Sequence, residues 1–521
     1  MMIFRKQFSK ILLVALMAMM GAGCGKEARK NRYLSRANRD FVAEQYDKAE
    51  VEYLNVLKIA PLEPTAISRL GLIYYGEGKL SQAYEFLKKA AEVEPENMEA
   101  RTKLGLACLS FRKMKEAREQ TLAVLEKQPG NGEALILLAD CVTNSTEVQH
   151  IMSLLEGFRQ RDNESAGYHV ALATLYLRQQ EIEKAESEVK KAMALDPKSS
   201  AAYQSLGTVY LMRKDLKQAE VAFKAAAGLA PWRSVRRLAY AGFKVDSGAT
   251  EEGKKIAEEI TQKAPDYLPA WTFLAKIAFA EGKYEDCSGF LKKVEIRDLP
   301  NYEALMLNGK IMLVRGEGTN AVAQFERVLR LYSANPQAHL ELARAHLVNG
   351  DINKCVGSLK TALASDPELV DAILMLADIN IQTGESSSAI VALSQLVKRR
   401  PQIVQGHLLL ASAYAAEKNF DDSMGVLHRM MPLFPENPKV PYLLGTILLR
   451  QNKQAEARQA FEKSLELSPK YIPALEQLID FDLVDKQYDT ARTRVKAQME
   501  KQPNLADPWL LVAKISLVQG K

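Results

Sequence analysis

The sequence predicts an all-α fold, a superhelical solenoid of stacked antiparallel helix hairpins. Three observations predict this fold: small residues recur every 34 positions, glycine or alanine recurs twelve positions earlier, and proline recurs twelve positions later. Of the fourteen positions in each series, thirteen are small, thirteen are glycine or alanine, and eleven are proline. A fixed period of this length is typical of repeat proteins, in which each unit packs on its neighbours.

The first 23 residues have the features of a signal peptide. Three basic residues precede an apolar run at 11–20, and a Gly-Ala-Gly-Cys motif that ends at Cys24 follows it. The run is too short for a comfortable membrane span. The motif resembles the bacterial lipobox, although Gly21 stands where most lipoboxes have leucine. The resemblance implies cleavage before Cys24 and lipidation of its thiol. The alternative is an ordinary secretory signal with an incidental cysteine.

The residues after Cys24 bear on where the chain is anchored. We expect 24–29 to form the lipidated N-terminus, because several acyl chains on Cys24 would give stable membrane anchoring. In lipoproteins of diderm bacteria an aspartate at the next position signals retention in the inner membrane. Gly25 therefore implies the periplasmic face of the outer membrane. Residues 26–39 carry six basic side chains and one acid, which either lie on anionic headgroups or form a solvated first helix.

Fourteen complete units of 34 residues run from 30 to 505. In the clearest unit, 64–97, apolar residues recur at three- and four-residue spacings in two stretches, so both stretches are predicted helices. Gly71 and Ala83 let the two helices approach closely. Pro95 ends the second helix and begins the next hairpin.

These residues resemble the tetratricopeptide repeat (TPR), in which a Leu-Gly pair and a tyrosine on the first helix precede alanine, phenylalanine and proline. The resemblance covers about residues 30–521, since the phase never slips. It implies a protein-interaction scaffold without a cofactor and without enzyme activity. In the repeat at 200–233, the matching residues are Leu206, Gly207, Tyr210, Ala219, Phe223 and Pro231.

Residues 506–521 match the first helix of a fifteenth repeat that stops before its second helix. Repeat arrays normally end in a capping helix with a polar outer face. We therefore expect further chain after Lys521. Further repeats, a β-barrel or a catalytic, glycosyltransferase-like domain are the alternatives, and in the last two cases the present residues are the scaffold portion of a longer protein.

No catalytic or metal-binding motif stands out in the repeats. We find no glycine-rich phosphate loop, nucleophile elbow or zinc motif, and we predict no metal site. Cysteines 108, 141, 287 and 355 fall at packing positions, as do His339 and His346. Without the signal peptide the chain has 67 basic and 64 acidic side chains. This balance argues against nucleic acid as a partner.

The family resemblance places partner binding on the concave surface, which the first helices line. The twelfth residue of the repeats is mostly apolar, which predicts an apolar row that suits an extended peptide or a helix. The ninth residue is basic in three successive repeats, which predicts a row of cations for an acidic segment or an anionic polysaccharide. The predicted contacts are Phe279, Leu313 and Leu347 in the apolar row, and Lys276, Lys310 and Arg344 in the row of cations.

A lipid anchor followed by a long TPR array resembles the lipoproteins that accompany exopolysaccharide export. It is most similar to the large TPR-repeat lipoproteins of the PEP-CTERM/exosortase sorting system. The resemblance implies a non-catalytic scaffold on the cell envelope that holds protein or peptide partners for export or sorting.

Overall fold

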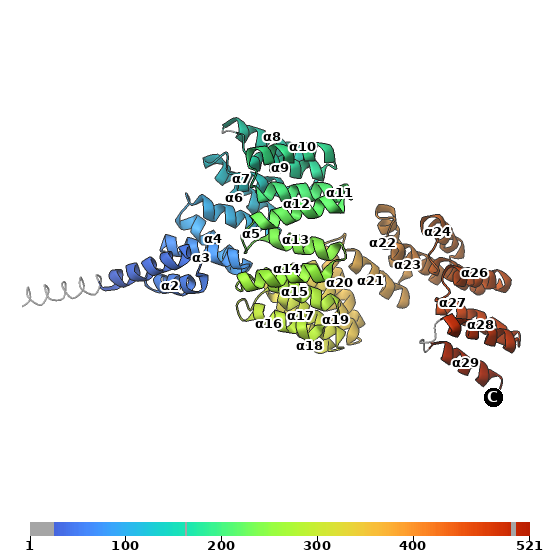
Figure 1. Cartoon of the computed structure of the whole chain (residues 1–521). Coiled ribbons are helices and arrows are strands. Elements are labelled where there is room, and N and C mark those ends of the chain that lie inside the picture. The colour runs from blue at the N-terminus through green and yellow to red at the C-terminus, as the bar shows by residue number, and fades with distance from the viewer. Residues whose placement is uncertain (1–24, 162–163, 502–506, 521) are drawn as a thin grey trace, which may run out of the picture. The chain divides into compact units, whose positions relative to one another are not determined.

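A computed structural model describes residues 25–161, 164–501 and 507–520. Every regular element in these ranges is a helix, and the helices follow one another as antiparallel hairpins (Figure 1). The predicted all-α solenoid is confirmed. The predicted signal peptide at 1–23 and Cys24, the predicted lipidation site, lie outside the described residues, as do the end of the fourteenth repeat at 502–505 and Lys521.

The chain divides into two compact units, Met1–Ile311 and Met312–Lys521. The described part of the first unit opens with a helix over 25–42. Its further helices, two to a repeat, are α2 (Tyr46–Ile59), α3 (Pro64–Glu77), α4 (Leu80–Val93), α5 (Met98–Ser110), α6 (Met114–Lys127), α7 (Gly132–Asp140), α8 (Ser145–Arg161), α9 (Ala166–Arg178), α10 (Ile182–Leu195), α11 (Ser200–Met212), α12 (Leu216–Leu229), α13 (Val235–Asp246), α14 (Thr250–Lys263), α15 (Leu268–Ala280) and α16 (Tyr284–Glu295).

The division between the units falls inside α17 (Tyr302–Val314). The second unit continues with the same alternation of first and second helices. Its helices are α18 (Gly318–Leu331), α19 (Pro336–Val348), α20 (Ile352–Ser365), α21 (Val370–Gln382), α22 (Ser386–Arg399), α23 (Val404–Ala416), α24 (Phe420–Leu433), α25 (Lys439–Arg450), α26 (Gln454–Leu467), α27 (Ile472–Val484), α28 (Tyr488–Lys501) and α29 (Asp507–Val518).

Glycine on the first helix allows close packing within a hairpin. A Cβ added to Gly71 would lie 2.8 Å from the side chain of Leu87, and one added to Gly207 would lie 2.8 Å from the ring of Phe223. Both distances are shorter than van der Waals contact. The small residue on the second helix is equally enclosed, since Ala83 is fully buried. The two small-residue series therefore mark the lines along which paired helices touch.

The turn between the helices of a repeat has a constant backbone conformation. A residue with positive φ occurs at the fifteenth position of every described repeat except 132–165, where Asn144 instead caps the start of α8 through its side chain. Glycine supplies this conformation in some repeats, such as Gly78 and Gly316. A residue with a side chain does so in seven: Glu44, Arg112, Gln180, Lys214, Lys418, Asn452 and Lys486.

Candidate functional site

The predicted apolar row lies at the surface of the first helices. Phe279 on α15 is half-buried and packs edge-on against Tyr284, with ring centroids 5.6 Å apart. Leu313 on α17 is half-buried, and Leu347 on α19 is 41% exposed. These side chains are thus partly open to contact. Their role in ligand binding stays a prediction.

The predicted row of cations is largely paired with carboxylates of the chain itself. Lys276 lies 2.8 Å from Glu303 of the next repeat. Arg344 lies 3.1 Å from the buried carboxylate of Glu341 and 3.4 Å from Asp371. Lys310 is half-buried on α17. These neighbouring acids reduce the net positive charge that Lys276 and Arg344 present, and the anion-binding role stays a prediction.

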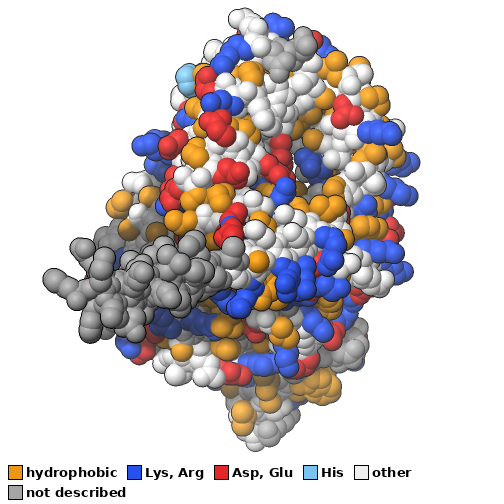
Figure 2. Space-filling model, turned by 90° about the vertical axis from the view of Figure 1, so that its left-hand side faces the viewer, with side chains coloured by type: hydrophobic (Ala, Val, Ile, Leu, Met, Phe, Trp, Pro, Cys, Tyr) orange, Lys and Arg blue, Asp and Glu red, His pale blue; other side chains and the backbone are white. Residues whose placement is uncertain are grey.

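Charge elsewhere is also mixed in sign. Figure 2 shows lysine and arginine side chains interspersed with aspartate, glutamate and hydrophobic side chains on one face of the molecule. The basic stretch that follows Cys24 is partly compensated as well, since Lys30 lies 2.8 Å from Glu27 and 3.2 Å from Glu63. Among the described residues, no helix combines the length and apolar character needed to cross a membrane.

The four cysteines of the repeats are buried and unpaired. Burial raises the pKa of each of these thiols to about 11. The predicted packing role therefore fits their surroundings. His346 is buried, and the ring of His339 lies 3.1 Å from the carbonyl oxygen of Ser333. No group of metal-binding side chains occurs within the part of the chain that the structure describes.

The second unit has an open groove of about 600 Å³ between the second helices α20 and α22, with α21 beneath. Its lining combines aliphatic side chains with a few polar ones. The groove lies beside the second helices, whereas the predicted contacts lie on the first helices. The residues that line the groove include Ile352, Val356, Lys360, Leu363, Ile373, Leu376, Asn380 and Glu385.

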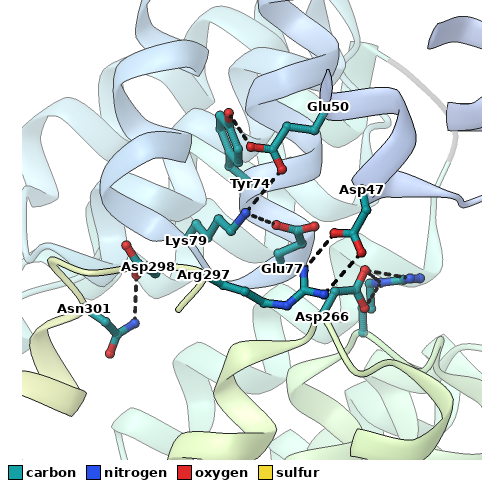
Figure 3. Close-up of polar contacts among 10 residues, drawn as sticks. Asp47, Glu50, Tyr74, Glu77, Lys79, Asp266, Arg297, Asp298 and Asn301 are labelled. Atoms are coloured by element: carbon teal, nitrogen blue, oxygen red, sulfur yellow. Dashed lines mark hydrogen bonds and ion pairs between the residues drawn. The ribbon is translucent and has the colours of Figure 1, made fainter. Parts of the chain in front are cut away.

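The first unit contains contacts between repeats that are far apart in sequence. The Arg297 guanidinium, in the loop after α16, donates two hydrogen bonds to Asp47 at the start of α2, at 2.8 and 3.2 Å (Figure 3). The Arg233 guanidinium, in the loop before α13, lies 3.1 Å from Glu44 and 4.5 Å above the ring of Tyr46. The chain therefore curls so that the first repeat meets the loops at the ends of the sixth and eighth repeats.

A second contact involves the turn of the repeat at 64–97. Gly78 has a φ of +82°, and a Cβ added to it would lie 2.4 Å from Pro269 at the start of α15. Beside it, the Lys79 ammonium lies 2.7 Å from Glu77 and 3.3 Å from Glu50 (Figure 3). The Glu77 side chain is completely buried, and its carboxylate faces the Lys79 ammonium.

Sequence reasoning did not identify these contacts. Asp47 and Arg297 are separated by 250 residues, and Glu44 and Arg233 by 189. Glu44, Arg233 and Arg297 lie in turns or loops and Asp47 lies in the first turn of α2, all positions where a charged residue is ordinary. No motif or spacing in the sequence distinguishes them from other solvated charges. Only the curvature of the array brings them together.

Models of the tetratricopeptide repeat match the chain in several blocks. The matches cover residues 74–141 and 210–277, then 170–231, 307–368 and 374–438, and finally 440–471. Together they span well over half of the chain. A search of curated proteins finds no match.

Solved structures are similar to this chain, two of them over most of its length and one over a shorter part. The Cut9–Hcn1 hetero-tetramer of the APC/C matches with 15% identity, a TM-score of 0.41 and coverage of 86% of this chain and 96% of the other. Yeast Tom70 matches with 16% identity, a TM-score of 0.38 and coverage of 95% and 96%. YrrB, described as a TPR protein with an unusual peptide-binding site, matches with 16% identity and a TM-score of 0.31, over 36% of this chain and 96% of its own.

Proposed function

Because the chain belongs to the tetratricopeptide-repeat family, we propose that it is a protein-interaction scaffold that holds protein or peptide partners along its first helices. The observation that carries this proposal is the row of partly exposed apolar side chains at the twelfth repeat position. Leu211 and Leu347 are 38% and 41% exposed, although Val209 on α11 and Ala345 on α19 are buried. An apolar row on helices suits an extended peptide or an amphipathic helix.

The proposed place of action is the periplasmic face of the outer membrane, with a lipid on Cys24 as the anchor. The signal peptide at 1–23 and the Gly-Ala-Gly-Cys motif support it. The proposed process is exopolysaccharide export or exosortase-type protein sorting. The combination of a lipoprotein signal with a long repeat array supports this process by architecture alone.

The Cys24→Ala variant tests the anchor. We expect wild type to sediment with membranes and the variant to appear in the soluble envelope fraction, because the thiol that carries the lipid is absent. Fractionation followed by immunoblotting measures this. Unprocessed precursor is distinguished by its higher mass, so the comparison uses only chains of mature size. Mature variant that still sediments with membranes would exclude Cys24 as the anchor.

A photoreactive amino acid at position 347 tests the binding surface in cells. We expect Leu347 on the first helix α19 to give discrete cross-linked species. The matched control is Val391 on the second helix α22, which is 61% exposed and therefore more accessible. Cross-linking that is equal at both positions, or confined to Val391, would place the partner away from the first helices.

A further inference from the structure

The long-range contacts of the first unit form one continuous region, which we call the closure contact. Its two sides come from opposite ends of eight repeats. One side is the pair of turns in the first two repeats, and the other is the set of three loops that precede α13, α15 and α17. The closure contact consists of Glu44, Asp47, Glu77, Gly78 and Lys79 on the first side, and Arg233, Asp266, Pro269 and Arg297 on the second.

The closure contact is polar, whereas neighbouring repeats are joined by apolar packing. The buried residues of the first repeats belong to a hydrophobic cluster that runs from Ala37 to Cys141. The residues behind the second side belong to separate clusters, one around Tyr267 and Ala270 and one that begins at Leu268. Across the contact itself lie two arginine pairs, one ring beneath Arg233, and the Gly78–Pro269 approach.

The arginine pairs differ in how far water reaches them. Arg233 is 17% exposed and also lies 2.9 Å from the buried carboxylate of Asp266 on its own side. Arg297 is 28% exposed, but its partner Asp47 is 64% exposed. Exposed ion pairs contribute little to stability, whereas the helix stacking within each side is apolar and continuous. The closure contact is therefore held in large part by ion pairs that have one exposed partner, whereas the repeats on each side are joined by apolar packing.

Side chains on the inner surface of the same unit approach one another from distant repeats. Arg236 on α13 is close enough to Tyr75 on α3 and to Asp140 on α7 to act on the ionisation of both. Burial raises the pKa of Tyr75 to about 12 and also raises the pKa of Tyr267 and of Asp140. The part of the inner surface around Tyr75, Asp140 and Arg236 is thus occupied by the unit's own side chains.

We propose that the closure contact is a reversible junction that controls access to the inner surface of the first unit: when its ion pairs separate, the first two repeats move away from the loops around Arg233 and Arg297. The opening itself does not depend on the proposed scaffold function. That function enters only in what the open inner surface receives, namely an extended peptide or helix.

The buried carboxylate of Glu77 connects this junction to pH. Its pKa is raised to about 7, first by burial and then by the charges of Glu50 and Asp266, while Lys79 opposes the shift. Asp266 and Arg297 both belong to the second side, so closing the unit brings one charge that raises this pKa and one that opposes the rise, in addition to burial. A carboxyl whose pKa is higher in the closed form stabilises that form when it is protonated. This contribution to closure is fully present below the ordinary pKa of a glutamate and is lost as pH rises through about 7.

Other ionisable groups face Glu77, and the directions of their pKa shifts limit the pH range in which these groups affect closure. The hydrogen bonds from Arg297 lower the pKa of Asp47, so the Asp47 pair is lost only in more acidic solution. Burial raises the pKa of Asp298, in the same direction as Glu77. Burial also raises the pKa of Tyr46 and of Tyr74, which stay neutral at physiological pH. The remaining charged neighbours are Glu44, Glu50, Lys79, Arg233 and Asp266.

A distance measurement between spin labels tests the junction. Val42 and Ile296 lie on opposite sides near the closure contact, are 83% and 73% exposed, and take no part in its ion pairs. The full chain carries Cys24→Ser with Val42→Cys and Ile296→Cys, since the other four cysteines are buried. Double electron–electron resonance at pH 6 should give one short distance. A variant with Arg233→Glu and Arg297→Glu should give a longer, broader distribution.

Three further variants make the result decisive. The milder Asp47→Asn, at an exposed position, should lengthen the distance partially, and the charge swap Asp47→Arg with Arg297→Asp should restore the short one. Arg161→Glu is the matched control, because Arg161 pairs with Glu126 of the neighbouring repeat, at 3.0 Å, outside the closure contact. It should leave the distance unchanged. A short distance in both the double reversal and Asp47→Asn, each folded by circular dichroism, would overturn the proposal.

The same labels test the contribution of Glu77. With a pKa of about 7 in the closed form and an ordinary value in the open form, the ratio of closed to open chains should fall about tenfold from pH 6 to pH 8. Glu77→Gln, which stays neutral, should remove this dependence and stay closed at pH 8. A wild-type ratio that is constant with pH, or an unchanged dependence in Glu77→Gln, would exclude Glu77 as the group responsible.

Discussion

At the residue scale, two aspartates that accept hydrogen bonds from the same arginine differ in how far water reaches them. Asp482 on α27 is completely buried and accepts hydrogen bonds from Arg458 at 2.7 Å and from Arg494 at 2.9 Å. Asp485, three residues on, accepts from the same Arg458 at 2.7 Å but is 51% exposed. Water competes for Asp485 and cannot reach Asp482. The two carboxylates therefore offer a matched comparison in one local structure.

We expect Asp482→Ala to destabilise the second unit by about 3 kcal/mol, since two arginines would lose a buried partner. Asp485→Ala should cost less than about 1 kcal/mol, as exposed pairs do. Chemical denaturation followed by circular dichroism measures both. Equal losses for the two variants would mean that burial of the Asp482 carboxylate has no energetic consequence.

The turn between paired helices is the informative feature at the scale of the element. The sequence predicts the helices well, because their apolar spacing and small residues report packing between near neighbours in the chain. It does not reveal that the fifteenth position has positive φ, because residues as different as Glu44, Lys214 and Gly316 all adopt it. Side-chain identity at this position is thus a poor guide to conformation, and the conformation is imposed by the helices on either side.

Lys214→Gly should raise the stability of its hairpin. Lys214 has a φ of +60°, which costs a residue with a Cβ about 1 kcal/mol and glycine almost nothing. Part of this gain is lost to the greater entropy of glycine in the unfolded chain, so we expect a net gain of about 0.5 kcal/mol. Thermal melting measures it.

The reverse substitution is the control for the turn. Gly316 has a φ of +73°, and a Cβ there would meet open space. Gly316→Ala should therefore destabilise by about 1 kcal/mol through backbone strain alone. If both variants lowered the melting temperature, the left-handed turn could not be the source of the difference.

At the scale of the whole molecule, the array and its curvature were not equally predictable. The 34-residue period predicts the repeats, because each hairpin packs on the next through residues close in sequence. The approach of Asp47 to Arg297 depends on small rotations added over many repeats, and no single spacing encodes that sum. The proposed ligand contacts were only partly predictable from the sequence. Their exposure on first helices follows from the repeat phase, but the pairing of Lys276 with Glu303 required the structure.

The row of cations can be tested with defined anions. If it binds ligands, Lys276→Glu, Lys310→Glu and Arg344→Glu together should weaken binding of polyglutamate and alginate at least tenfold at low salt and reduce the dependence on salt. Fluorescence titration at two salt concentrations measures this. The control variant replaces three exposed lysines of second helices by glutamate, so that its net charge changes by the same amount. These lysines are Lys224, Lys263 and Lys398. An equal loss in both variants would indicate net charge alone.

The closure contact restricts the gain or loss of whole repeats in the first unit. A solenoid ordinarily gains or loses whole repeats at little cost, since each new unit meets only its two neighbours. Between Asp47 and Arg297 that freedom is restricted, because one repeat more or fewer would displace Arg297 from its partner by a full step of the array. The number of repeats in the first unit is thus constrained by the contact between its two ends, and not only by the packing of each hairpin on its neighbours.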